Sequence, residues 1–255
     1  MNQNELKTFL DFKYDQYNRP EFIVSDPVSI PHRFTKKEDI EISAFLTAMI
    51  AWGYRPGIIK SASKLMNLLH NTPYDFILNA KENEWKQFKS FVHRTFQSDD
   101  LLYFIFSLKN IYKNHHGLQN VFHEGYKKNN SIKESIIYFR KIFLECEHLQ
   151  RTTKHISSPE KKSSCKRINM FLRWMIRNDN RGVDFGIWNN FSASDLFCPL
   201  DLHSGNVSRK LGLLMRKQSD WKAVEELTNN LRKFDFRDPA KYDFALFGLG
   251  IFEKF

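Results

Sequence analysis

The chain has 255 residues, enough for a sizeable hydrophobic core in one large domain or two small ones. Its 39 lysines and arginines outnumber 29 acidic residues, and the net charge of +10 favours a polyanionic partner, nucleic acid before an anionic membrane. The three cysteines, Cys146, Cys165 and Cys198, exclude a four-cysteine cluster and fit a reducing cytoplasm.

The composition predicts an all-α protein. Glycine (10) and proline (8) are sparse, whereas phenylalanine (24) is abundant beside many Leu, Ile, Lys and Glu residues. No repeat, low-complexity segment or linker indicates a division of the chain. The first ten residues, MNQNELKTFL, contain no apolar run, so we expect neither a signal peptide nor a membrane helix.

Apolar periodicity and turn residues predict the following elements in chain order. They are an amphipathic helix over 5–17, a connecting loop over 25–32, an apolar helix from Lys36 through Met49, a loop over 52–57, a helix over 58–70, two or three helices within 73–126 (the clearest over 99–112), a helix over 132–149, a helix from Lys166, a helix from Asp201 through Leu214, and helices over 221–231 and 244–251.

The loop Trp52-Gly53-Tyr54-Arg55-Pro56-Gly57 combines rigid aromatic rings, a cation and two glycines. This composition is typical of a wedge that holds a DNA duplex open after a base is extruded. A packed helix-turn-helix corner with Trp52 in the core explains the same residues equally well. We expect Tyr54 and Arg55 to be more exposed than Trp52.

From 151 to 167 the chain is strongly basic and rich in Ser and Thr. Such a segment is typical of phosphate contacts, and a solvated loop is the alternative. Arg167, Arg173 and Arg177 would bind phosphate only if they share the face of Lys166. Arg173 and Arg177 lie one helical turn apart and share a face with each other. His115, His116 and His123 lack a ligand spacing typical of a metal site.

Lys166 and Asp201 each lie near the start of a helix. The run Ser163-Ser164-Cys165 offers a cap for the first helix, and Pro199 followed by Asp201 suits the start of the second. A helix N-terminus disfavours the protonated form of a lysine, and a neutral lysine can form a Schiff base that a carboxylate assists. The 35 positions between the two residues permit a contact without requiring it. A solvated lysine and a plain helix cap are the alternative.

These two elements resemble the active-site region of the helix-hairpin-helix DNA glycosylase superfamily, nearest the 8-oxoguanine glycosylase/lyase branch. Lys166-Arg167-Ile168-Asn169-Met170-Phe171-Leu172-Arg173 is similar to its catalytic lysine helix, and Leu200-Asp201-Leu202-His203 to its aspartate element. Residues 42–66 resemble its early helix pair, and residues 93–112 the stretch that follows. The chain resembles more closely still a bacterial family of unknown function built on this fold.

The resemblance implies a two-lobed, glycosylase-like fold in which residues 1–255 form one catalytic unit with a cleft between the lobes. It implies a monomeric DNA repair glycosylase and AP lyase that excises an oxidised purine from damaged double-stranded DNA. We expect the protein to lie in the bacterial cytoplasm, associated with the nucleoid and not with a membrane. We also expect it to need no cofactor or metal. The implied catalytic residues are Lys166 and Asp201; the DNA contacts Trp52, Tyr54, Arg55, Lys161, Lys162, Ser163, Ser164, Arg167 and His203; and the base pocket Trp188, Lys254 and Phe255.

The sequence departs from the superfamily before Lys166. A Gly-x-Gly turn normally lets backbone amides approach a phosphate, whereas residues 158–164 contain no glycine, and residues 181–195 read as an insertion. Trp188 lies in an aromatic loop that would stack on a base or cap a core. These features keep two further hypotheses open: a non-catalytic module that binds DNA or RNA structure on the same fold, and a helical scaffold whose charge aids solubility or meets an acidic protein.

Overall fold

The computed structural model describes residues 1–255, apart from the side chain of Glu82. The described residues form α-helices, 3-10 helices and loops without a β-strand; an isolated antiparallel bridge joins His93 and Phe96. The predicted all-α class is therefore confirmed. No helix of the described part combines the length and the apolar character needed to cross a bilayer.

The chain divides into two compact units. Unit 1 consists of Met1–Phe22 and Ser158–Phe255, and unit 2 of Ile23–Ser157. The short helix α2 (Pro20–Val24) spans the boundary between them. The glycosylase-like cleft stays a prediction.

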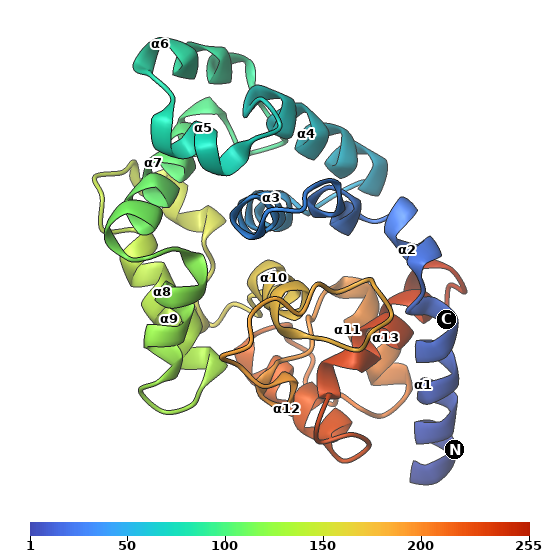
Figure 1. Ribbon diagram of the computed structural model, residues 1–255. Coiled ribbons are helices and arrows are strands. Elements are labelled where there is room, and N and C mark those ends of the chain that lie inside the picture. Colours follow the sequence, from blue (N-terminus) through green and yellow to red (C-terminus); the bar gives the residue numbers. More distant parts are fainter. The chain divides into compact units, whose positions relative to one another are not determined.

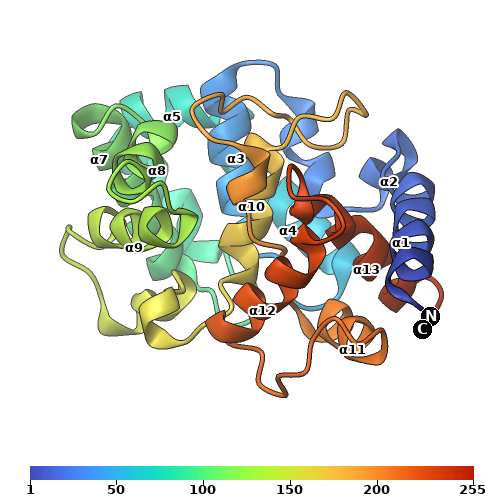
Figure 2. The same cartoon turned by 90° about the horizontal axis from the view of Figure 1, so that it is seen from below.

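Unit 2 is built around an aromatic core. Phe45 on α3 contacts the rings of Phe104, Phe139 and Phe143, at centroid distances of 5.5 to 6.0 Å. Helices α8 and α9 lie side by side in both views (Figures 1 and 2). The helices of this unit are η1 (Pro27–Ser29), η2 (Pro31–Arg33), α3 (Lys37–Met49), α4 (Arg55–Leu68), α5 (Pro73–Asn79), α6 (Glu82–Trp85), η3 (Lys86–Ser90), α7 (Ser98–Asn114), α8 (Leu118–Tyr126), α9 (Ile132–Phe143) and η4 (Gln150–His155).

Unit 1 joins the first helix of the chain to the last third of the sequence. Figure 1 shows α1 beside α13, where Tyr17 packs directly against Gly248. Helix α10 is the buried centre, since every residue from Ile168 to Ile176 is inaccessible to solvent or nearly so. The helices of this unit are α1 (Gln3–Tyr17), η5 (Pro159–Lys161), α10 (Lys166–Ile176), η6 (Ala193–Asp195), α11 (Leu202–Lys210), α12 (Trp221–Arg232), η7 (Pro239–Lys241) and α13 (Tyr242–Ile251).

Several predicted boundaries were wrong. Helix α4 begins at Arg55 rather than residue 58, because Pro56 fits the first turn of a helix. Helix α9 ends at Phe143 rather than 149, since the hydroxyls of Tyr103 and Ser107 donate to the Phe143 carbonyl. Residues 73–126 hold α5 to α8, one helix more than expected, and the loop over 25–32 contains two short 3-10 helices. Helix α11 ends at Lys210, short of the predicted Leu214.

Candidate active site

Lys166 and Asp201 meet in unit 1. Lys166 is the first residue of α10, and Asp201 is the N-cap of α11. Lys166 Nζ lies 3.8 Å from Asp201 Oδ2, and the two side chains are 27% and 24% exposed. The pair is therefore formed within unit 1, and both side chains are partly exposed.

The two oxygens of Asp201 have different partners. Oδ1 accepts hydrogen bonds from the backbone N–H of Ser204 at 2.9 Å and from its hydroxyl at 3.1 Å. The Asp201 N–H donates to the same hydroxyl at 2.9 Å, which completes a capping box. Oδ2 faces Lys166. Because the cap fixes the orientation of the carboxylate, one oxygen is held toward the lysine amine.

The turn before α10 is built without glycine. The Ser158 carbonyl accepts hydrogen bonds from the N–H groups of Lys161 and Ser163, and Lys162 takes a left-handed conformation with φ 59°. Cys165 is also left-handed (φ 50°), and α10 has no side-chain cap, contrary to the cap expected from Ser163 to Cys165. Non-glycine residues in this region carry strain, so the surrounding packing has to hold them.

A hydrogen bond ties this turn to the segment that carries Asp201. The Ser164 hydroxyl donates to the Leu200 carbonyl at 3.3 Å, and the Asn169 amide donates to the Ser164 carbonyl at 3.1 Å. Further on, the Cys198 N–H donates to the Thr228 hydroxyl on α12. These hydrogen bonds hold the turn before α10 against the segment 198–201. Lys166 and Asp201 lie close together for this reason, although 35 positions separate them in the sequence.

A buried charge network lies at the C-terminal end of α10, where Arg177 is the C-cap. Arg177 is inaccessible to solvent and pairs with Asp179, Asp184 and Asp238 at 2.8 to 3.0 Å. Its Nη2 also donates to the Tyr14 hydroxyl at 2.8 Å, so α1 is tied to the same network. Burial opposes the charge of Arg177, but the neighbouring aspartates raise its pKa above the ordinary value.

Arg173 extends this network to α13. Its Nε lies 3.2 Å from Asp184, and its Nη1 lies 2.5 Å from Asp243. Burial raises the pKa of Asp243 to about 6, although the charge of Arg173 opposes the rise. Both arginines are thus buried and paired with carboxylates, which leaves them unavailable to a phosphate.

The other predicted residues of unit 1 differ in accessibility. Lys161, Lys162 and His203 are exposed, and Ser163 and Ser164 are half-buried. Arg167 is half-buried, and burial lowers its pKa to about 10. The Ser163 hydroxyl accepts a hydrogen bond from the Cys165 N–H at 3.1 Å.

The three residues assigned to a base pocket lie in different surroundings. Trp188 is 0% exposed and packs edge-on against Phe171, so no face of its indole is open to a base. Phe255 is exposed and lies between Phe9 and Lys210, at 6.5 Å and 5.7 Å from its ring centroid. Lys254 is exposed.

The loop with the predicted wedge residues lies in unit 2. Trp52 packs edge-on against His93 and stacks on His155, at centroid distances of 5.2 and 5.9 Å, so it forms part of a corner. Tyr54, by contrast, is 79% exposed, and Arg55 is half-buried. The geometry fits the packed-corner interpretation for Trp52 and leaves Tyr54 accessible.

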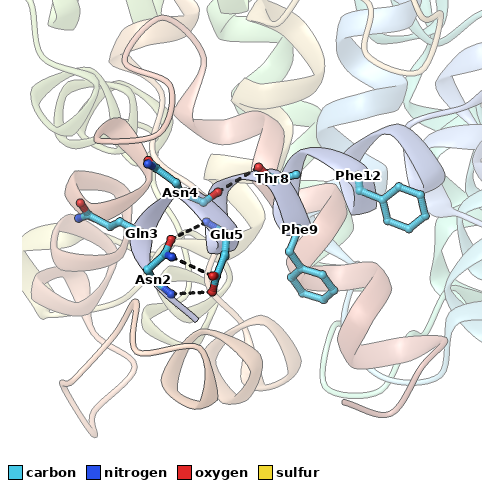
Figure 3. Close-up of a pocket in the computed structure, with 7 residues that line it drawn as sticks. All are labelled: Asn2, Gln3, Asn4, Glu5, Thr8, Phe9 and Phe12. Carbon is cyan, nitrogen blue, oxygen red and sulfur yellow. Dashed lines mark hydrogen bonds between the residues drawn. The ribbon is translucent and has the colours of Figure 1, made fainter.

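A separate hollow runs along the first turns of α1 (Figure 3). Its polar groups already bond to one another, because Asn2 and Glu5 form a capping box and Thr8 donates to the Asn4 carbonyl. The lining residues are Asn2, Gln3, Asn4, Glu5, Thr8, Phe9 and Phe12, so it is distinct from the Lys166–Asp201 pair. Nowhere in the described part do three or more His, Cys, Asp or Glu residues gather as metal ligands.

The sequence was compared with family models, with curated proteins and with solved structures. Residues 26–252 match the model of the family described as "Protein of unknown function (DUF2400)". The chain belongs to this family. The family's range contains Lys166, Asp201 and the whole of α10 to α13, but it begins after α1. No curated protein and no solved structure matches the chain.

Ser204, Asp184 and Asp243 were not predicted from the sequence as residues of this region. A signal for the last two was present, because Arg173 and Arg177 interrupt an otherwise apolar helix and Asp243 stands in the apolar run from Tyr242 to Leu249. Charged residues in apolar surroundings are rarely buried unless they are paired. Their spacing did not show which carboxylate meets which arginine.

Proposed function

We propose that this protein is a DNA repair glycosylase-like enzyme with AP-lyase activity that excises an oxidised purine through a Schiff base on Lys166. The observation that carries the proposal is the lysine–carboxylate pair at the starts of α10 and α11, 3.8 Å apart. It combines a potential nucleophile with an oriented anion, and both side chains remain accessible. The resemblance of these two elements to the helix-hairpin-helix glycosylases supports the same chemistry.

The chemistry begins with the neutral amine of Lys166. Nζ bonds to C1′ of the deoxyribose while the bond from C1′ to the base breaks, and the base leaves with the bonding electrons and takes up a proton. Opening of the sugar ring gives a protonated imine between Nζ and C1′. Loss of a proton from C2′ then expels the 3′ phosphate and cleaves the strand.

Asp201 supports this reaction through its charge. The carboxylate oxygen that faces Lys166 stabilises positive charge as it develops on the sugar and on the imine. The Ser204 cap keeps this oxygen in place without a further rearrangement. Lys161 and Lys162, exposed just before α10, would neutralise phosphates of a double-stranded DNA substrate.

Borohydride trapping tests the proposal, because hydride reduces the imine to a stable amine that links protein and DNA. The wild type is incubated with duplexes that carry 8-oxoguanine or an abasic site, beside Lys166→Gln and the matched control Lys217→Gln, which changes an exposed lysine on the loop after α11. We expect adducts with the wild type and the control, and none with Lys166→Gln. Trapping of Lys166→Gln at the wild-type level would overturn the assignment of the nucleophile.

A non-catalytic module that binds DNA or RNA structure is the second candidate. The burial of Trp188 favours it, because this residue was one of the two aromatic candidates for a base pocket. Tight, salt-sensitive binding to duplexes without any trapped adduct would establish this alternative. No affinity for nucleic acid near physiological salt would instead favour a helical scaffold.

A further inference from the structure

A glycine in unit 2 makes room for the side chain of an arginine. Gly53 lies in the loop between α3 and α4 and has φ 101°, a backbone conformation that glycine adopts readily. A Cβ at this position would lie 2.6 Å from Arg94 Nη1, so the Arg94 guanidinium lies against the backbone of Gly53. The cation is therefore held beside the loop segment that carries Tyr54.

The backbone of Arg94 is held by a two-residue turn. His93 and Phe96 exchange backbone hydrogen bonds at 2.8 and 2.9 Å. Arg94 and Thr95 form the tip of the turn, and Arg94 is left-handed with φ 55°. The Thr95 carbonyl accepts a hydrogen bond from Arg151 Nη2 at 3.2 Å. These bonds hold Arg94 in a conformation that non-glycine residues adopt only under constraint.

The loop and the turn share one packed base. The ring of Trp52, from the loop, lies edge-on against His93, from the turn, at a centroid distance of 5.2 Å, and it stacks on His155 at 5.9 Å. His93 Nδ1 lies 2.9 Å from the Ser61 hydroxyl, and His155 Nε2 lies 3.3 Å from the buried carboxylate of Asp100. The loop and the turn are therefore held in a fixed relation to each other.

Two side chains on this base point to solvent without an internal partner. Tyr54 is 79% exposed, and Arg94 is exposed as well. Among the residues that the structure describes, neither side chain has a hydrogen bond or an ion pair. Asp100 is fully buried and already pairs with Arg151, so it does not neutralise Arg94. Two residues with positive φ thus support an uncommitted aromatic ring and cation, and such departures from ordinary backbone geometry are typical of binding sites.

An aromatic ring beside a guanidinium fits a nucleotide. A base stacks on an exposed aromatic face, and a guanidinium donates two parallel N–H bonds to a phosphate. Because the bases of a duplex stack on one another, the ring requires a base that lies outside the stack. The net charge of +10 also favours a polyanionic ligand.

We propose that Tyr54 and Arg94 form a binding site for an unstacked nucleotide of a nucleic-acid strand, with its base on the Tyr54 ring and its phosphate on the Arg94 guanidinium. The sequence predicted Tyr54 as a DNA contact but did not indicate Arg94. Unpaired strands supply nucleotides of this kind. The site lies within unit 2 and does not use Lys166, so the inference does not rest on the proposed enzyme activity.

Binding of a single-stranded oligothymidylate to the full chain tests the two contacts separately, by fluorescence anisotropy at several salt concentrations. Arg94→Ala should weaken binding and lower the slope of log K against log salt by about 0.7, the value for one phosphate of a single strand. Tyr54→Ala should lower the affinity by about 10-fold at an unchanged slope, because stacking releases no counterion, and Tyr54→Phe should bind as the wild type does.

The control is Lys113→Ala. It removes an exposed positive charge from the last turn of α7, whereas the base of the site includes Asp100 in the first turn of that helix. We expect this variant to keep both the affinity and the slope of the wild type.

Two further variants test the geometry. Gly53→Ala would place a Cβ against Arg94 Nη1, so it should lose about as much affinity as Arg94→Ala, and the double variant should lose little more. Arg94→Lys introduces no such overlap. It should keep the salt slope and lose affinity, because an ammonium cannot bond a phosphate in the bidentate manner.

The outcomes separate this proposal from the proposed enzyme activity. If Tyr54→Ala and Arg94→Ala bind the oligonucleotide as Lys113→Ala does, or if the wild type does not bind it, the nucleotide site is overturned, whatever the trapping experiment shows. If both variants lose affinity as expected while the wild type traps no DNA, the proposed enzyme activity fails and the nucleotide site stands.

Discussion

At the scale of single residues, Asp201 combines a structural and a chemical role in one side chain. One oxygen caps α11 through Ser204, and the other faces Lys166. Substitution can separate the two roles, because asparagine is as good an N-cap as aspartate but carries no charge. Position 201 is therefore the place where stability and chemistry can be measured independently.

Asp201→Asn is expected to keep the stability within about 0.5 kcal/mol and to lower the trapping rate on abasic DNA by about 10²-fold or more. Asp201→Ala, by contrast, loses both the charge and the cap, and its unfolding free energy falls by about 1 kcal/mol. Urea denaturation and single-turnover trapping measure the two effects. An Asn variant that traps as fast as the wild type would remove the carboxylate from the mechanism.

The buried arginine of α10 gives a second prediction at this scale. Arg177→Met would remove the arginine paired with Asp179 and Asp238 and one of the two arginines paired with Asp184, and breaking a buried pair from one side costs about 3–5 kcal/mol. The control is Arg181→Ala, whose pair with Asp15 is 36% and 57% exposed and is worth at most about 1 kcal/mol. Similar losses in the two variants, measured by denaturant unfolding, would show that the network contributes little.

At the scale of elements, the sequence predicted where α10 and α11 begin because the signals are local. Lys166 follows a turn-forming run, and Pro199 with Asp201 marks a helix start. The pairing of the two residues depends on tertiary contacts such as Ser164 to Leu200, which no local pattern specifies. The partners of Arg173 and Arg177 could not be predicted either, because these carboxylates lie up to 70 positions away in the sequence. Without those partners, the two arginines were interpreted as possible phosphate ligands.

The packing of α13 on α1 can be tested at Gly248. A Cβ at this position would overlap the ring of Tyr17, so Gly248→Ala should separate the two helices and cost about 1–3 kcal/mol. Gly57→Ala in α4 is the control, because its Cβ meets no atom and alanine favours the helix by up to about 1 kcal/mol. A stabilising Gly248→Ala would contradict the close approach of α1 and α13.

At the scale of the whole molecule, the net charge of +10 predicts salt-sensitive DNA binding. Lys161→Ala and Lys162→Ala should each reduce the slope of log K against log salt by about 1, since each removes one phosphate contact. Lys217→Ala, an exposed lysine on the loop after α11, should leave the slope unchanged. Fluorescence anisotropy at several salt concentrations measures this slope for each variant. Equal slopes for all three variants would exclude the turn before α10 from the DNA interface.

The identity of the trapped lysine tests the central claim most directly. The adduct of the wild type with an abasic duplex is reduced, digested with nuclease and trypsin, and mapped by mass spectrometry. Because trypsin does not cleave after a modified lysine, attack by Lys166 predicts the sugar remnant on the peptide 163–167, Ser-Ser-Cys-Lys-Arg. A remnant on Lys161, on Lys162 or on the N-terminal amine instead would contradict the assignment of Lys166 as the nucleophile.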